Sequence, residues 1–433
     1  MCDDLNRNGQ LCGKCKKGFA PPVYSYSLKC VNCMDYSLNW LKYIAVAFGP
    51  LTVFSFIITV FHISPTSPYL HGFIFYCHIT IRLVVVANGY APPSVASQVY
   101  LSLLGIWNLD FFPLVYNSFC IHPHITVLQA LALDYIVAAY PLLLVCIIFF
   151  LVSLHSHDCT LVVAIWKPFG CVLRPFLRNL NVQTSLIESF ATLYLLSIIK
   201  FQTVTLDLLT PTVLYHMDRT HGKELYLYLA GDVKYFGQDH WPYAVLAISA
   251  FILIIILPTV LLFLYPCQCF QQCLNRLHCN SHTLQTFMDV FQGHYKDGTN
   301  QSRDFRYFSG VYFVGRTVCV AVFALLNSYE ALITIGVFLT IFCVTVTMLH
   351  PQRTNIHYIV DSFFLLFLAL LCLSGAGYIL VPYNHTLVSV SLIFLVSAVF
   401  LPFLFQTGLF LYWACLRRKI PQRIFRKVHT TLH

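Results

Sequence analysis

The sequence predicts an all-α polytopic membrane protein with about nine transmembrane helices and a small disulfide-rich N-terminal module. The composition predicts the class, because 58% of the 433 residues are hydrophobic and only 10% are charged, with a mean hydropathy of +0.71. Soluble domains carry about 25% charged residues. The module is predicted by position, since five of the 18 cysteines precede the first long apolar run: Cys2, Cys12, Cys15, Cys30 and Cys33.

Residues 1–38 are too short and too polar to bury a core, so covalent or metal cross-links must hold their shape. The pattern C-x9-C-x2-C-x14-C-x2-C admits two kinds of cross-link. Paired CxxC knuckles would bind zinc in a reducing cytosol, whereas an EGF-like extracellular module would use disulfides, with Cys2 paired upstream or free. We favour disulfides, because Gly9 to Gly18 resembles the end of a laminin- or EGF-type repeat. The odd cysteine count and the polar start suggest a truncated ectodomain.

Residues 39–414 form the predicted helical transmembrane domain. A crossing helix needs about 20 apolar residues. Ten segments qualify, near 39–63, 70–90, 97–117, 126–154, 183–205, 241–265, 309–328, 330–349, 358–381 and 386–414.

The distribution of charge predicts the orientation. Lys and Arg gather in 167–178, in 276–306, at Arg353 and after 416, so the positive-inside rule places these segments and the C-terminus in the cytoplasm. Segments 206–240, 328–330 and 382–386 then face outside. Asn384, in the sequence Asn-His-Thr, is a predicted glycosylation site on that side.

One of the first four apolar segments must fail to cross if the cysteine module is outside and 155–182 is cytoplasmic. We predict that 97–117 is this segment, because Trp107, Asp110 and Pro113 suit an interfacial or re-entrant stretch. That leaves about nine spans in the plasma membrane, with the N-terminus extracellular. A cytosolic zinc ribbon would instead allow all ten segments to cross.

Ionisable residues inside the spans have two interpretations. Each costs a few kcal/mol unless paired or hydrated, so they form either ion pairs that fix helix register or a polar pathway or ligand pocket. Glu188 and Lys200 cannot pair with each other, because twelve residues separate them. Their helix is rich in hydroxyls and is the one we expect to line any pathway. The set comprises Arg82, Asp134, Glu188, Lys200, Arg316 and Asp361, with His78 beside Arg82.

Two cytoplasmic segments suggest lipid contact. Cys267, Cys269 and Cys273 directly follow a span and are predicted palmitoylation sites, although inert thiols are the simpler alternative and a zinc site fits the spacing poorly. Residues 415–433 form a polybasic tail that anionic inner-leaflet lipid would attract; its basic residues are Arg417, Arg418, Lys419, Arg423, Arg426 and Lys427. A tail this short predicts no nucleic-acid partner.

Several motifs carry a family resemblance. They are the loop 287–299, the stretch 303–308 with Arg316, and 105–112, 166–169 and 265–267. Through them the chain resembles, over nearly its whole length, a family of largely uncharacterised multi-pass proteins abundant in sponges, which carry an EGF-like ectodomain. More distantly, Gly-His-Tyr-Lys at 293–296 and the turn at 350–361 resemble TRP-like membrane proteins of fungi and protists, which implies a cation channel or transporter-like domain.

The motifs of common enzymes are missing: the sequence has no GxxxxGK[ST], HExxH or GxSxG pattern, so we predict no enzymatic activity, metal or cofactor. Two functions remain. The first is a TRP-like ion channel or transport protein with an extracellular sensing module, for which we expect assembly as a homo-oligomer. The alternative is an orphan sensor or adhesion receptor that binds an extracellular ligand and signals through 266–308 and 350–357 without transport.

Overall fold

The computed structural model describes most of the helical domain and parts of the N-terminal module. The described residues are 39–61, 70–88, 104–109, 120–156, 182–214, 224–276, 282–299 and 303–380, parts of 1–38 and 62–69, and isolated positions beyond 380.

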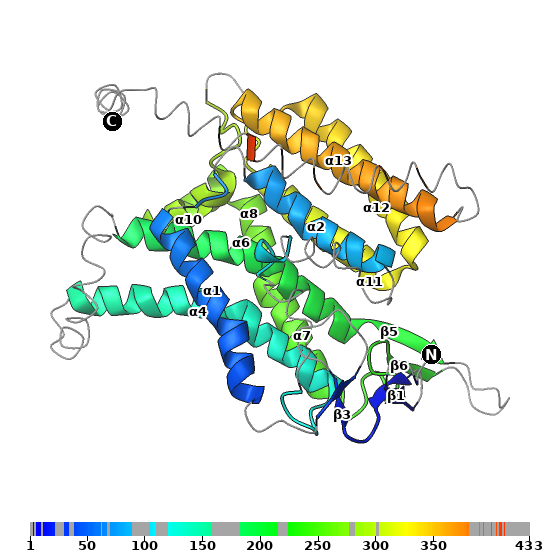
Figure 1. The fold of residues 1–433 in the computed structure, drawn as a ribbon. Coiled ribbons are helices and arrows are strands. Elements are labelled where there is room, and N and C mark those ends of the chain that lie inside the picture. The colour runs from blue at the N-terminus through cyan, green and yellow to red at the C-terminus, as the bar shows by residue number, and fades with distance from the viewer. Residues whose placement is uncertain are drawn as a thin grey trace.

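Helices dominate these residues, as the composition predicts (Figure 1). They are α1 Asn39–Phe61, α2 His71–Asn88, α4 Val127–Ser156, α6 Val182–Leu209, α7 Trp241–Ala250, the π-helical η2 Phe251–Ile256, α8 Leu257–Leu264, α9 Gln268–Arg276, α10 His282–Gln292, α11 Phe308–Leu325, α12 Ser328–Leu349 and α13 Asn355–Leu380.

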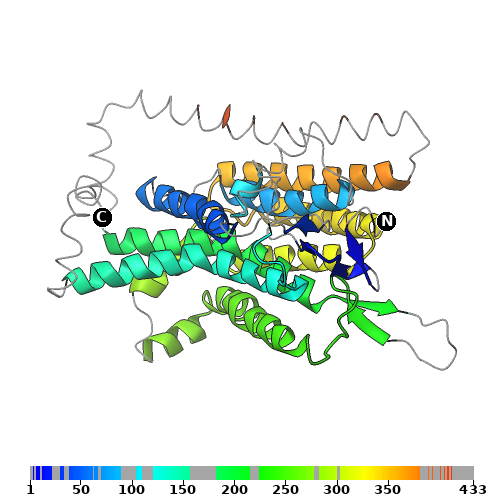
Figure 2. The same ribbon diagram turned by 60° about the horizontal axis from the view of Figure 1, so that its bottom comes forward.

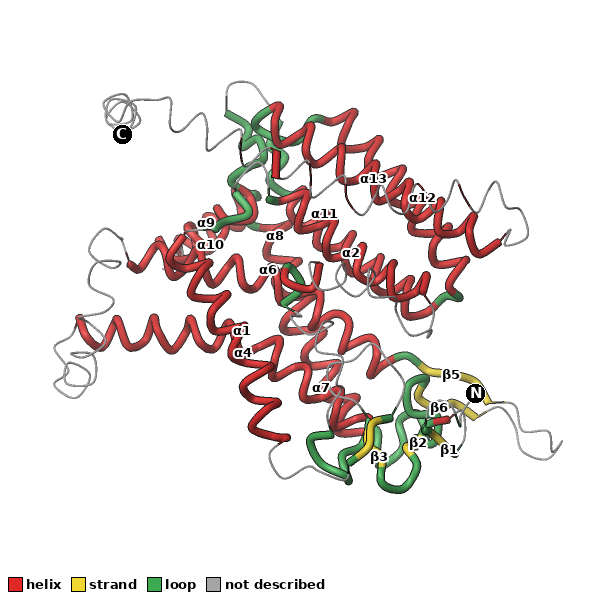
Figure 3. Tube along the Cα trace, viewed as in Figure 1, coloured by secondary structure: helices red, strands yellow, loops and turns green. Residues whose placement is uncertain are grey.

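The strands form three antiparallel pairs. They are β1 Arg7–Asn8 with β2 Lys14–Cys15, β3 Phe19–Ala20 with β4 Val31–Asn32, and β5 Pro211–Leu214 with β6 Glu224–Leu227. All three pairs lie together at one end of the helices (Figure 3).

Seven stretches of the described helices are long and apolar enough to cross a bilayer. They are Trp40–Thr59, Val127–Leu151, Leu186–Leu209, Trp241–Leu264, Phe308–Leu325, Ser328–Leu349 and Asn355–Gly377. Burial distinguishes a central helix from peripheral ones. In the apolar stretch of α6, 72% of the residues are buried, but only 17% are buried in the apolar stretch that runs from α7 through η2 to α8. The exposed apolar side chains of α7–α8 indicate a lipid environment. The predicted count of nine stays a prediction, and 386–414 lies largely outside the described residues.

The helices form two groups joined by α6 and α11 (Figures 1 and 2). In one group α2 contacts α11, α12 and α13, and in the other α6 contacts α1, α4 and α7. Every residue of α2 from His71 to Ile81 is buried. Although it carries His78 and Arg82, α2 is therefore a central helix, and its polar side chains must find partners within the protein.

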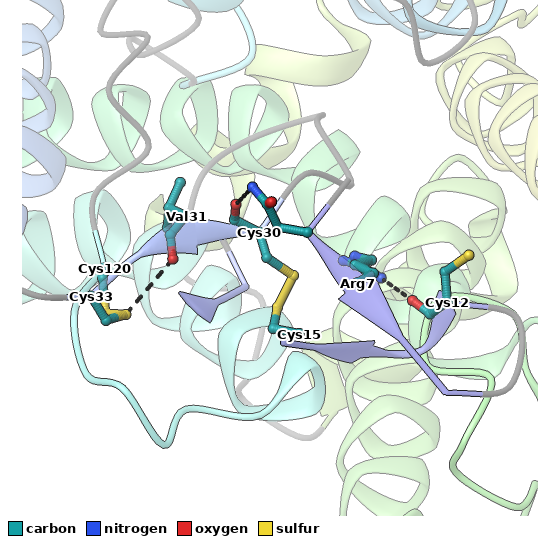
Figure 4. Close-up of a disulfide and its surroundings, with 8 residues drawn as sticks. Arg7, Cys12, Cys15, Cys30, Val31, Cys33 and Cys120 are labelled. Atoms are coloured by element: carbon teal, nitrogen blue, oxygen red, sulfur yellow. Dashed lines mark hydrogen bonds between the residues drawn. A yellow bond between two sulfur atoms is a disulfide. The ribbon is translucent and has the colours of Figure 1, made fainter. Parts of the chain in front are cut away.

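Disulfides hold the N-terminal module, as predicted over the zinc ribbon (Figure 4). Cys15 bonds Cys30, and their Cα atoms lie 5.7 Å apart. Cys33 bonds Cys120, with a Cα–Cα distance of 5.3 Å. Cys12 is also disulfide-bonded. Cys2 lies outside the described residues.

The Cys33–Cys120 bond fixes the parity of the first spans. Cys33 precedes α1, and Cys120 precedes α4, so both helices start at the end of the bundle that carries the strands. We call this end the disulfide face and the other end the opposite face. In Figure 1, α1 leads away from the disulfide face and α2 leads back toward it. The chain between Asn88 and Cys120 therefore starts and finishes on the disulfide face, consistent with the prediction that 97–117 does not cross.

Candidate functional site

A turn formed by Leu104–Leu109 lies inside the bundle, level with the middle of α2. The side chain of His78 donates from Nε2 to the Trp107 carbonyl at 3.2 Å, and Asn108 Nδ2 donates to the Cys77 carbonyl at 3.3 Å. Cys77 and His78 lie about 10 Å along α2 from its start, at 1.5 Å per residue. Since the chain returns to the disulfide face at Cys120, we call Leu104–Leu109 the re-entrant turn.

Aromatic contacts and a left-handed residue fix the shape of this turn. The Trp107 ring lies edge-on to Phe73 and Phe54, with centroid distances of 5.4 Å and 6.4 Å. Leu109 closes the turn with a φ of 55°, which is strained for a leucine. Packing of buried aromatic rings thus holds irregular backbone in the interior, where hydrogen bonds to α2 satisfy part of its polar surface.

Asp361 on α13 is the centre of a buried polar cluster near the opposite face. His71 Nδ1 donates to the carboxylate, 3.3 Å from each oxygen, and Gln352 Nε2 donates to Oδ2 at 3.0 Å. The Tyr312 hydroxyl lies 3.4 Å from the same oxygen. Close approach of α2 depends on Gly72, because a Cβ there would lie 2.6 Å from Asp361 Oδ1.

Arg316 lies one turn beyond Tyr312 on α11 and is fully buried. Its guanidinium carbon is 5.2 Å from the centroid of the Phe75 ring and 5.3 Å from that of Phe313, so two aromatic faces stabilise its charge. Asp361 attracts this charge electrostatically. Two of its donors, Nε and Nη2, have no hydrogen-bond partner among the described residues.

Three histidines join this cluster to the loop after α10. The ring of His294 lies 4.3 Å from that of His71 and 5.6 Å from that of His357, centroid to centroid. His357 Nε2 donates to the Thr66 carbonyl at 3.1 Å, so in the neutral ring Nδ1 accepts from the Thr354 hydroxyl at 2.7 Å. Both ring nitrogens of the buried His294 are without a partner in the described structure.

The pKa of His294 predicts a pH-dependent stability. Burial, and then the neighbouring His71 and His357, lower this pKa well below the usual 6.5. Below pH 6.5 the unfolded chain binds a proton that the folded protein does not bind, so stability is full above that pH. It falls by about 1.4 kcal/mol per pH unit as the pH drops toward the folded pKa. We expect His294→Phe to reduce the change of the thermal unfolding midpoint with pH between pH 7.5 and 5. His122→Phe, at an exposed site, should leave this pH dependence unchanged. An unchanged slope in His294→Phe would refute this assignment.

The structure brings together only some of the predicted intramembrane residues. Arg316 and Asp361 share one cluster, and the charge of Arg316 also acts on His78. Arg82 on α2 interacts electrostatically with Asp207 on α6. The other three are half-buried, with Asp134 on α4 and Glu188 and Lys200 on α6. The sequence prediction missed His71, His294, His357, Gln352 and Tyr312, and the polar loops at 293–296 and 350–361 were the only signal for them.

The helix α10 packs against the protein with its apolar side. The Phe291 ring lies 5.6 Å from that of Phe313 on α11, and Phe287 lies 6.4 Å from Tyr194 on α6. Gln292 Nε2 donates to the Leu262 carbonyl of α8 at 2.8 Å. This helix therefore couples α6, α8 and α11.

The remaining predicted sites are less constrained. Cys267, Cys269 and Cys273 are exposed free thiols at or beside α9, and their palmitoylation stays a prediction. Within the described residues, no group of His, Cys, Asp or Glu is arranged to hold a metal ion. Asn384 and the basic residues of the tail lie outside the described residues.

Comparison with known proteins identifies no relative of the chain. No protein-family model, no curated protein and no solved structure matches the chain. The resemblance to sponge multi-pass proteins and to TRP-like proteins therefore stays a prediction, and function has to be argued from the site.

Proposed function

We propose that the chain is a plasma-membrane transport protein or ion channel of TRP-like character, with the disulfide face outside the cell and the C-terminus in the cytoplasm. Disulfides persist in oxidising compartments, which supports this orientation. The loops that carry α9, α10 and Gln352 then lie in the cytoplasm, and the N-terminal module acts as an extracellular sensing element.

The observation that carries the proposal is the re-entrant turn beside incompletely bonded polar groups. Irregular backbone inside a membrane is tolerated only where protein buries it or where it lines a water-filled cavity. Beside and within this turn, His78 Nδ1 and Asn108 Oδ1 are buried and have no partner in the described structure. Water or a permeating ion is the natural partner for such groups. A bundle held only by apolar packing has no need of them.

Flux through proteoliposomes tests the proposal. Vesicles that contain the full chain should dissipate an imposed salt gradient faster than protein-free vesicles. Asn108→Leu, which removes polar atoms of the re-entrant turn, should reduce that flux by at least about tenfold. The control is Leu253→Ala on η2, at a residue that is 62% exposed on the outside of the bundle, and this change should not alter flux. Equal flux with and without protein would refute transport.

A second candidate function, an extracellular sensor or adhesion receptor without transport, rests on the docking of the N-terminal module. Lys14 Nζ lies 3.2 Å from Asp232 Oδ2. Gly13 packs so tightly on the same loop that a Cβ would lie 2.7 Å from the Gly231 and Asp232 amide nitrogens. A ligand bound by the module would thus act directly on the segment between β6 and α7. Ligand-induced change at the opposite face without any flux would favour this candidate.

A further inference from the structure

A cavity near the opposite face of the bundle lies against the buried charge of Arg316. Its polar lining consists of His71, Ser309 and Arg316, and apolar side chains of α6, α10 and α11 complete the wall. The enclosed part of this cavity has room for about one water-sized sphere, and the wider space of about 230 Å³ around it includes open solvent. The cavity is too small for a large organic ligand.

The donors of Arg316 that lack partners distinguish this cavity from a packing defect. Asp361 accepts hydrogen bonds from His71, Gln352 and Tyr312, but it accepts none from Nε or Nη2 of Arg316. The Ser309 hydroxyl donates to the Arg306 carbonyl at 2.9 Å, and it also accepts from neither of these donors. A buried guanidinium with open N–H groups is unfavourable unless something accepts from it.

We propose that this cavity binds a single monatomic anion, such as chloride, through Nε and Nη2 of Arg316. These two donors form the planar edge of the guanidinium that suits a carboxylate or a single anion. The flanking Phe75 and Phe313 rings hold that plane in place. The packing of α10 beside the cavity, through Val290 and Phe291, excludes large anions. The site is independent of transport, because it needs only the folded bundle.

Thermal unfolding of the purified full-length protein in detergent tests the site at constant ionic strength. Replacing sodium gluconate, whose anion is large, with sodium chloride should raise the unfolding midpoint saturably, by about 2–4 °C. Arg316→Lys keeps the charge but loses the planar pair of donors, so at least about tenfold more anion should be needed for half of the shift.

Two further variants keep the result decisive if Arg316 variants fold poorly. Leu195→Phe fills the cavity without changing any charge, because Leu195 lines the cavity and is 2% exposed, and it should abolish the shift. Arg353→Gln, at a side chain that is 61% exposed, should leave the shift intact. The proposal is overturned if gluconate stabilises as well as chloride, if no anion shifts the midpoint, or if Leu195→Phe responds like the natural chain.

Discussion

Replacing Asp361 with asparagine is expected to destabilise the protein by about 3–5 kcal/mol. The substitution keeps the shape of the side chain but removes the negative charge that attracts the fully buried Arg316. It also weakens the hydrogen bonds from His71 and Gln352, since bonds to a charged acceptor are about twice as strong as bonds to a neutral one. Thermal unfolding in detergent measures the loss.

A double-variant cycle separates the charge from the shape. The double variant Asp361→Asn with Arg316→Gln buries neither charge, so it should be more stable than Asp361→Asn alone. Strictly additive losses would show that Arg316 and Asp361 act independently, against the electrostatic coupling described above. Asp239→Asn, at an exposed position before α7, is a control for loss of a carboxylate and should change stability little.

Breaking the Cys33–Cys120 bond is the second large expected effect. The bond closes a loop with a sequence separation of 87, and the double variant Cys33→Ser/Cys120→Ser should lose about 2–4 kcal/mol. The membrane already restricts α1 and α4, so the loss should be smaller than for a soluble loop of this length. The control is Cys267→Ser, which replaces an exposed free thiol. A thermal midpoint unchanged in the double variant would contradict a structural role for this disulfide.

The membrane class could be predicted from the sequence because hydropathy is a local property. Runs of apolar residues located α1, α4, α6 and the later spans to within a few residues. The prediction that 97–117 does not cross came from the parity of the charges and from Trp107, Asp110 and Pro113; it stays a prediction, since only 104–109 of this segment belong to the described residues. The disulfide character of the module followed from the cysteines that precede α1.

Long-range contacts were not predictable from one sequence. Cys120 is 87 positions from its partner Cys33, and no local pattern marks it as different from other cysteines in apolar surroundings. The Asp361 cluster takes His71 from the start of α2, His294 from the loop after α10, and Gln352 from the turn before α13. Only the packing of these helices brings the three together. The apolar side of α10 fits protein and lipid equally well, so its periodicity alone did not identify its partner.

The central claim is that the chain enters and leaves the bundle on the disulfide face around the re-entrant turn. Labelling of single introduced cysteines with a membrane-impermeant thiol reagent tests it on intact cells, in a background in which the exposed free thiols Cys267, Cys269 and Cys273 are replaced by serine. His122→Cys, two residues beyond Cys120, and Lys16→Cys in the module should react from outside. Thr66→Cys, between α1 and α2, and Thr299→Cys, after α10, should react only after permeabilisation. Labelling of His122→Cys only after permeabilisation, with Lys16→Cys still labelled from outside, would mean that 97–117 crosses, and it would contradict the account.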